Sequence, residues 1–312
     1  MRKEKNLKQP TWKNTVTSDF KRNKQLYLMM LPVIVFFVLF CYLPMYGALI
    51  AFMDYRPSLG FMGSDWVGFK HFANFLSSPS FGHIFMNTVK ISISTLLLGF
   101  PAPIILALLM NEIRNKPFLK ITQNITYLPH FISLVVVCGL IKEFTKSDGL
   151  IGNIVAMFGG TPVSLLNYAE NFIPVYVISN IWQEVGWGTI IYLAALTGID
   201  HQLYEAAEID GAGKFKQMIH VTLPGIVPTI IIMLTMRMGQ MLNVGYEKII
   251  LLYNDAIMSS ADVISTYVYR KGLIDLDWSF SSAVGLFNAV INFALLIFVN
   301  TLNKKLQGSS LW

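Results

Sequence analysis

The sequence has few charged residues and few cysteines. Asp, Glu, Lys and Arg make up 13% of its 312 residues, against about 25% in ordinary soluble domains. Hydrophobic residues make up 54%, so the shortage of charge argues for lipid as the main solvent of this chain. The two cysteines, Cys41 and Cys138, both lie inside apolar runs, which excludes a disulfide framework and a CxxC metal pair.

The motifs of several catalytic sites are also missing. No G-x-x-x-x-G-K-[ST] segment occurs, so the chain has no phosphate-binding loop and cannot hydrolyse ATP by itself. Neither H-E-x-x-H nor G-x-S-x-G is present, and the five histidines are not grouped at the spacing of metal ligands. We therefore expect no catalytic residue, no metal and no bound cofactor in this chain, and a membrane enzyme is poorly supported.

Six apolar segments are long enough to cross a bilayer as helices. About 20 mostly apolar residues cover the roughly 30 Å of hydrocarbon. The first segment lacks an A-x-A cleavage site and is too long for a signal peptide, so it is predicted to be an uncleaved span. The sequence thus predicts an all-α, multi-pass membrane protein, with spans at Leu26–Phe52, Asn87–Leu109, Ile121–Ile141, Phe172–Leu196, Gly225–Val244 and Ser279–Leu302.

The positive charges predict how these spans are oriented. The connections on the side of the N-terminus carry fifteen Lys and Arg residues, eight of them within 1–25, whereas the connections on the opposite side carry seven. Cytoplasmic connections are the richer in Lys and Arg, so both termini and the connection after the fourth span are predicted to be cytoplasmic. The net charge of +6 forms no basic patch interleaved with aromatic residues, which argues against nucleic acid as a partner.

The connection over 204–228 is longer and more polar than two neighbouring spans require. Its first part is rich in helix-forming Ala and Glu and ends at a turn signal, Asp210-Gly211. Asp210 is predicted to cap a second helix through its carboxylate. That helix has one stripe of side chains facing the same way, formed by Phe215, Met218, Ile219 and Thr222. The pattern predicts two short helices that stand off the membrane to meet a partner; the alternative is an amphipathic helix in the headgroup layer.

This connection resembles the EAA motif of binding-protein-dependent ABC import permeases, which dock through it onto a cytoplasmic ATPase. Other segments, among them WVGFKHFANFL and IWQEVGWGTIIYLAALTGID, are similar in the same order to carbohydrate permeases of the maltose-transporter class, in particular to their LplB-like group. The residues that match the motif, and that the resemblance assigns to ATPase coupling, are Glu205, Ala206, Ala207, Asp210, Gly211, Ala212, Phe215, Leu223 and Pro224.

The resemblance implies a type I ABC importer permease fold with six transmembrane helices and cytoplasmic N- and C-termini. Its parts are a basic tail at 1–25, a permease domain at 26–303 with the coupling loop at 199–228, and a tail at 304–312. The implied function is import of a saccharide, expected to be an oligosaccharide, across a bacterial plasma membrane. The alternative function is a membrane-embedded scaffold or sensor that docks a soluble partner without moving solute.

The resemblance also implies a set of partners. A cytoplasmic ABC ATPase dimer, which uses ATP and Mg, is expected to dock at the coupling loop. A second homologous permease, expected to be a different chain, completes the pathway. An extracellular substrate-binding lipoprotein is expected to deliver the saccharide.

Polar side chains inside the predicted spans are the candidates for the substrate pathway. An ionisable group that faces lipid costs at least about 2.5–3.5 kcal/mol, so such groups face a cavity or one another. Amides and charged groups hydrogen-bond sugar hydroxyls, and Trp packs on the sugar ring. The same amides serve equally well between helices, and an ion pair of Glu184 with Arg237 is a further alternative. The candidates are Trp182, Gln183, Glu184 and Trp187 on the fourth span, Arg237, Gln240 and Asn243 as one stripe on the fifth, and Asn288 and Asn292 on the sixth.

Overall fold

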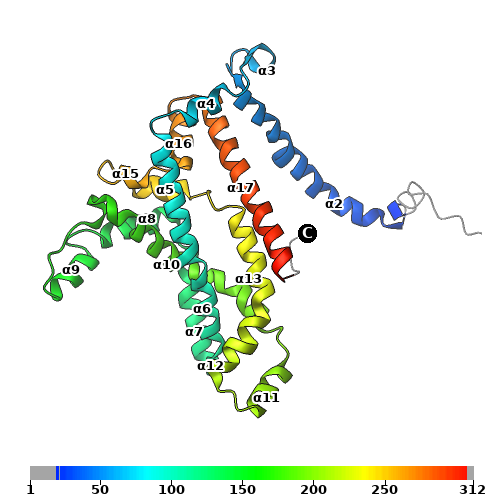
Figure 1. Ribbon diagram of the computed structural model, residues 1–312, viewed down its shortest axis with the longest axis vertical. Helices are drawn as coiled ribbons and strands as arrows, with labels where there is room; N and C mark the ends of the chain where they lie inside the picture. The colour runs from blue at the N-terminus through cyan, green and yellow to red at the C-terminus, as the bar shows by residue number, and fades with distance from the viewer. Residues whose placement is uncertain (1–18, 21, 308–312) are drawn as a thin grey trace, which may run out of the picture.

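The computed structural model describes residues 19–20 and 22–307, and its structure is predominantly helical (Figure 1). A short antiparallel hairpin is formed by β1 (Met53–Asp54) and β2 (Asp65–Trp66). Four of the described helices are long and apolar enough to cross a membrane, or five if one bent pair counts as a single span. The chain is therefore a helical protein with several membrane-spanning candidates.

The first predicted span is one helix, made of α2 (Lys24–Phe36), η1 (Phe37–Tyr42) and η2 (Leu43–Phe52). The most apolar part of this helix is 0% buried. In Figure 1 it extends away from the other helices and meets them only at its C-terminal end, where η2 packs against α17 (Trp278–Gln307). Its apolar surface is thus left uncovered by the part of the chain that the structure describes.

The second predicted span is also a single helix. α5 (Phe81–Ser94), η3 (Thr95–Gly99) and α6 (Pro101–Asn111) follow one another without a break, and together they span 31 residues. Pro101 lies inside this helix, just after the π-helical segment η3, and its missing N–H interrupts the helical hydrogen bonds there. The helix begins six residues before the predicted Asn87, because its first turns belong to the same amphipathic segment.

The third predicted span is broken in its middle. Its first half is α7 (Lys116–Tyr127) with η4 (Leu128–Phe131), and its second half is α8 (Leu134–Phe144), bent by 99° from the first. The span predicted over 121–141 is therefore not one continuous helix. Pro129 cannot donate a backbone hydrogen bond, and Ser133 starts a new helix because its side chain accepts the backbone N–H of the third residue after it.

The long helix α10 (Phe172–Leu196) has the bounds predicted for the fourth span and packs against α6, α7 and η4. Gly186 allows its close approach to α7, because a Cβ atom there would lie 2.0 Å from the carbonyl oxygen of Thr126. Polar residues and glycines reduce the apolarity of α10, and it is not among the four spanning candidates.

The chain then turns at one end of the molecule and runs back as another long helix. α11 (His201–Ile209) is followed by α12 (Lys214–Gln217), η7 (Met218–Thr222) and α13 (Leu223–Met238), and the last three form one continuous helix. In Figure 1, α11 and α12 lie at the bottom, at the end opposite to α3 and α4. The two short helices predicted for this connection are confirmed, although the second continues directly into the membrane candidate.

The fifth predicted span, 225–244, is wrong at its C-terminal end. Its helix stops at Met238, and the chain turns through 239–245 before helix α14 begins. The sixth predicted span lies within α17. The end of the predicted C-terminal tail, 308–312, lies outside the described residues, as do residues 1–18 of the predicted N-terminal tail.

The remaining short helices are α3 (Gly60–Gly63), α4 (Lys70–Leu76), α9 (Leu150–Met157), η5 (Leu165–Asn167), η6 (Ala169–Asn171), α14 (Tyr246–Leu252), α15 (Met258–Ala261), α16 (Ile264–Tyr269) and η8 (Arg270–Ile274).

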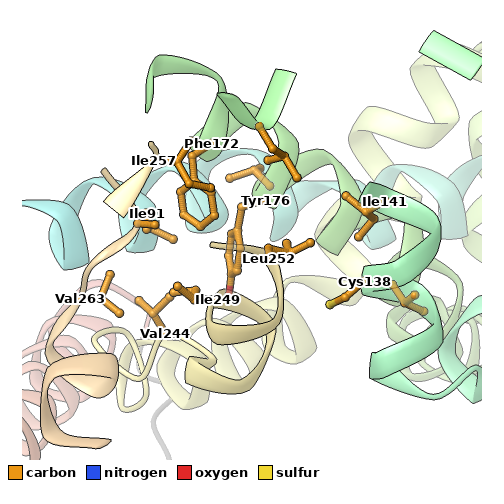
Figure 2. Packing of buried hydrophobic residues seen from close by; sticks show 14 residues of the cluster. Ile91, Cys138, Ile141, Phe172, Tyr176, Val244, Ile249, Leu252, Ile257 and Val263 are labelled. Carbon is orange, nitrogen blue, oxygen red and sulfur yellow. The ribbon is translucent and has the colours of Figure 1, made fainter. Parts of the chain in front are cut away.

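A cluster of buried apolar residues holds the segment after α13 against α10 (Figure 2). Burial of such side chains contributes about 25 cal/mol per Å² of apolar surface removed from water; against lipid, close packing supplies the stabilisation instead. The cluster fixes α14 beside α8 and the first turns of α10. Its members include Ile91, Cys138, Phe172, Tyr176, Ile249 and Leu252.

Ion pairs hold the connections at the end opposite to α11. The Nζ atom of Lys70 lies 2.7 Å from one carboxylate oxygen of Asp54, and Nε2 of His71 lies 2.9 Å from the other. The hydrogen bond from Lys70 lowers the pKa of Asp54 below its ordinary value of 3.8. Arg270 forms a two-pronged ion pair with Asp262, with N–O distances of 2.9 and 2.6 Å. These contacts hold the connections at this end of the molecule in one conformation.

Candidate functional site

A cavity of about 760 Å³, here called the central cavity, lies between α10, the helix over 81–111 and the segment after α13. This volume falls in the range of about 300–1,000 Å³ that is usual for small-molecule sites. Five of the nine predicted pathway residues line the cavity, namely Gln183, Glu184, Trp187, Arg237 and Asn243. The other four, Trp182, Gln240, Asn288 and Asn292, are not part of its lining.

Two residues of the cavity lining, Glu184 and Trp187, are held by His130. Nδ1 of His130 lies 3.0 Å from Oε2 of Glu184, and the His130 ring stacks on Trp187 with centroids 4.5 Å apart and planes 2° from parallel. His130 comes from η4, next to the break between α7 and α8. The alternative of an ion pair between Glu184 and Arg237 is wrong, because no salt bridge joins these two described residues and Oε2 of Glu184 contacts His130 instead. Arg237 makes no salt bridge with any residue that the structure describes.

The polar residues after α13 do not form the predicted helical stripe. Arg237 belongs to the last turn of α13, whereas Gln240 and Asn243 follow in turns. There the backbone N–H groups of Gln240, Met241 and Asn243 bond the carbonyl three residues earlier. Arg237 and Asn243 line the central cavity, and Gln240 is exposed outside it. Residues three apart share a face only while the chain stays helical, and α13 ends at Met238, before Gln240 and Asn243.

The amides of Asn243 and α17 form a small network. The side-chain oxygen of Asn243 accepts hydrogen bonds from Nδ2 of Asn288, at 2.9 Å, and of Asn292, at 3.0 Å. Oδ1 of Asn292 in turn accepts the backbone N–H of Leu242 at 2.9 Å. The network ties the turns at 239–245 to α17. Of the two alternatives for Asn288 and Asn292, these contacts favour hydrogen bonding between segments.

The predicted coupling loop forms two helices joined at a left-handed glycine. Gly211 has φ +75°, a conformation that costs other residues about 1–2 kcal/mol. The oxygen Oδ1 of Asp200 accepts the backbone N–H of Gln202 and so caps α11. Asp210 follows the last residue of α11 and does not cap α12, whose N-cap is Gly213. The predicted role of Asp210 as a cap of the second helix is wrong, because the left-handed turn separates it from that helix.

The two halves of the loop are also joined by side chains. The hydroxyl of Tyr204 lies 2.9 Å from that of Thr222, and Nε2 of Gln217 donates to the carbonyl of Ala212 at 3.0 Å. The outer surface of the loop is strongly exposed, with Phe215 70% and Ile209 86% accessible. Of the predicted coupling residues, Ala207, Ala212 and Leu223 are half-buried and the others, Glu205, Ala206, Asp210, Gly211, Phe215 and Pro224, are exposed. A rigid, apolar and exposed surface of this kind is suited to docking.

The sequence matches a known protein family. The family described as "binding-protein-dependent transport system inner membrane component" matches residues 99–308. The chain belongs to this family. It is an inner-membrane permease, a transport subunit and not an enzyme.

Two relatives and one solved structure support this assignment over nearly the whole permease. Protein LplB of Bacillus subtilis is 44% identical over 94% of this chain and 92% of its own length. The polygalacturonan/rhamnogalacturonan transport system permease protein YteP of the same organism is 45% identical over 91% and 89%. A chain in the crystal structure of a bacterial alginate ABC transporter, in complex with an alginate-bound periplasmic protein, has 42% identity and a TM-score of 0.87 over 94% of this chain and 99% of its own.

Residues that the sequence did not single out complete the cavity of the permease. Lys248 lies in the connection between the fifth and sixth predicted spans, yet only 4% of it is accessible and it lines the central cavity. His130, which holds Glu184, lies in the predicted third span and was assigned no role. The only sequence signal for Lys248 is its place directly before the apolar run IILL, which is typical of a buried helix rather than a loop.

Proposed function

We propose that this permease carries a saccharide, expected to be an oligosaccharide, through the central cavity into the cytoplasm. The observation that supports this most is the chemistry of the cavity wall, where a carboxylate, a guanidinium, amides and an indole ring face one space. Sugar hydroxyls need both donors and acceptors, and the C–H faces of sugar rings pack on aromatic rings. The relative YteP is named for polygalacturonan and rhamnogalacturonan transport and the matched structure for alginate, so a saccharide is the substrate class we carry over.

The proposed architecture has six spans with both termini in the cytoplasm. The bent pair of α7 and α8 serves as the third span and α10 as the fourth. A helix of 25 residues is about 37 Å long, enough to cross roughly 30 Å of hydrocarbon. The proposed parts are the tail at 1–25, the permease domain at 26–303 and the tail at 304–312.

We further propose that the coupling loop, 199–228, docks onto a cytoplasmic ABC ATPase dimer. The exposed Phe215 and the neighbouring Ile209 would enter an apolar groove of the ATPase, while Glu205 offers its carboxylate to a basic partner. ATP and Mg belong to the ATPase, and the permease binds no cofactor. Closure of the ATPase would move the loop and the helix over 214–238 as one rigid body.

The complete importer in this proposal has two further partners. A second, different permease covers the other side of the pathway, and the uncovered apolar surface of the helix over 24–52 is consistent with a further protein or lipid contact. An extracellular substrate-binding lipoprotein delivers the saccharide at the end that carries α4 and α16, as expected for a binding-protein-dependent family.

ATPase activity of the reconstituted complex tests this function. The complex is assembled in liposomes with its ATPase, second permease and binding protein, the latter loaded from a panel of oligosaccharides. We expect one loaded form to stimulate ATP hydrolysis and to accumulate inside. Glu205→Lys should abolish both without loss of membrane insertion, whereas Glu112→Lys, an exposed charge reversal outside the loop, should change neither. An intact complex that no saccharide stimulates would contradict saccharide transport and favour the scaffold function.

A further inference from the structure

The central cavity contains a buried cation without a partner. Lys248 of α14 is only 4% accessible, and its Nζ atom has no hydrogen-bond partner among the described residues. Its nearest favourable contact is the face of the Tyr176 ring, 5.5 Å away. An unpaired buried ammonium costs far more free energy than a solvated one. Burial accordingly lowers the pKa of Lys248 to about 8, so the ammonium is still the major form at pH 7 but is held at a cost.

Two hydroxyl groups in the same cavity are also without partners. Oγ of Ser92 and Oγ1 of Thr95 are buried and make no hydrogen bond within the described part of the chain, and both residues line the central cavity. Among the described residues, four buried side-chain polar atoms lack a hydrogen-bond partner. Three of them belong to Ser92, Thr95 and Lys248, and the fourth is Oδ1 of Asn288. Buried polar groups are normally satisfied, so their concentration on one cavity indicates a ligand that supplies the missing partners.

The charges around the cavity indicate which ligand. Lys248 and Arg237 both line it, and neither forms a salt bridge with a described residue. Two carboxylates line it as well. Oε2 of Glu184 contacts His130, and Glu184 acts on Lys248 through its charge without a direct contact, while Glu247 is exposed. Neither acid is within salt-bridge distance of Lys248. The missing partner of the ammonium is therefore an anion brought by the ligand, and a carboxylate forms charge-assisted hydrogen bonds with both lysine and arginine.

We propose that Lys248 is a specificity-determining residue that binds the carboxylate of an acidic sugar, a uronic acid unit, within the saccharide that this permease carries. Ser92 and Thr95 hydrogen-bond hydroxyls of the same saccharide, and Arg237 supplies a second positive charge to the cavity. The proposal rests on the proposed saccharide import and adds the substrate class to it. A neutral saccharide leaves Lys248 unpaired and is carried less well.

The test is uptake by the reconstituted importer of uronate oligosaccharides, made of galacturonate or of mannuronate and guluronate, against neutral galactose and arabinose oligosaccharides of equal length. Lys248→Met removes the charge and keeps an apolar chain of similar length, while Lys248→Arg keeps the charge. Lys142→Met removes an exposed lysine of α8 that does not line the cavity. We expect Lys248→Met to lower uronate uptake about tenfold or more, the usual effect of losing a hydrogen bond to a charged group. Lys248→Arg should retain most of it and Lys142→Met all of it.

The outcomes separate this inference from the proposed function. If the unmodified importer moves none of the oligosaccharides, saccharide import itself is contradicted. If it moves neutral oligosaccharides best, or if Lys248→Met leaves uronate uptake unchanged, import stands and the carboxylate subsite is refuted. A uniform loss for acidic and neutral substrates would likewise assign Lys248 a structural role. If Lys248→Met does not assemble, Lys248→Gln, which keeps a donor without the charge, is expected to give the same selective loss and is read in the same way.

Discussion

Replacement of Gly186 by alanine should separate α10 from α7 and damage the central cavity. The added Cβ atom would lie 2.0 Å from the carbonyl oxygen of Thr126, 2.3 Å from its carbon and 2.9 Å from the backbone nitrogen of Tyr127. All three atoms belong to the backbone, so no side-chain rotation relieves the clash. Ordinary van der Waals contact begins at 3.4 Å, and the two helices must therefore separate by about 1.4 Å.

The expected cost follows from this displacement. Overpacking of a close helix contact costs about 1–3 kcal/mol, which is a large part of the free energy of unfolding of a typical domain. The helix α7 continues into η4, which carries His130, so the movement also lengthens the 3.0 Å contact between His130 and Glu184. A shift of this size exceeds the range in which a hydrogen bond persists. The variant should lose both stability and the shape of the cavity wall.

The measurement compares three alanine variants of the purified importer in detergent. Thermal unfolding and saccharide-stimulated ATPase activity are recorded for each. Gly186→Ala should lower both clearly. Gly188→Ala, whose Cβ would meet the Pro103 side chain at 3.0 Å, should have a smaller effect. Gly139→Ala, with nothing within 4 Å of its Cβ, should have none. Equal melting temperatures and activities for Gly186→Ala and Gly139→Ala would refute the reasoning.

Two further predictions concern the opposite ends of the molecule. Gly211→Ala places a Cβ on a residue with φ +75° and should cost about 1–2 kcal/mol. It should reduce stimulated ATPase activity at normal membrane insertion. The control is Gly213→Ala, at φ −67° with open space around it, and equal activities of the two variants would contradict the role of the left-handed turn. At the other end, the hydrogen bond from Lys70 lowers the folded-state pKa of Asp54 below 3.8, so its stabilisation is present above that pH and is lost as the pH falls through the lowered value. Asp54→Asn should therefore remove a contribution below about 1 kcal/mol at neutral pH. It should also make thermal stability less sensitive to acid as the pH falls below 3.8. An unchanged acid sensitivity would show that the ion pair contributes nothing.

The elements that follow from local pattern were predicted well. The bounds of α10 agree with the predicted fourth span, and the helices over 24–52 and 278–307 enclose the predicted first and sixth spans. A long apolar run forms a helix because every backbone polar group must be satisfied within the segment when lipid is the solvent. The bend at Gly211 was likewise predictable, since glycine adopts positive φ at little cost.

The predictions that failed depend on contacts between distant residues. Pro129 marked a weak point in the third predicted span, but proline is tolerated in membrane helices when neighbours satisfy the freed backbone groups. The early end of α13 is accompanied by the hydrogen bonds of Asn243 and Leu242 to α17, about fifty residues further along the chain. No local spacing contains that information.

The sequence by itself determined the class of the protein, the positions of most helices and the bend of the coupling loop, because apolar length and glycine conformation act within a few residues. Only the tertiary structure decided which polar groups meet. It paired Glu184 with His130 rather than with Arg237. It also brought Lys248, from the connection between the fifth and sixth predicted spans, into the central cavity without a hydrogen-bond partner among the described residues. Pairing between charges depends on distance through space and on burial, and both are set by how the helices pack.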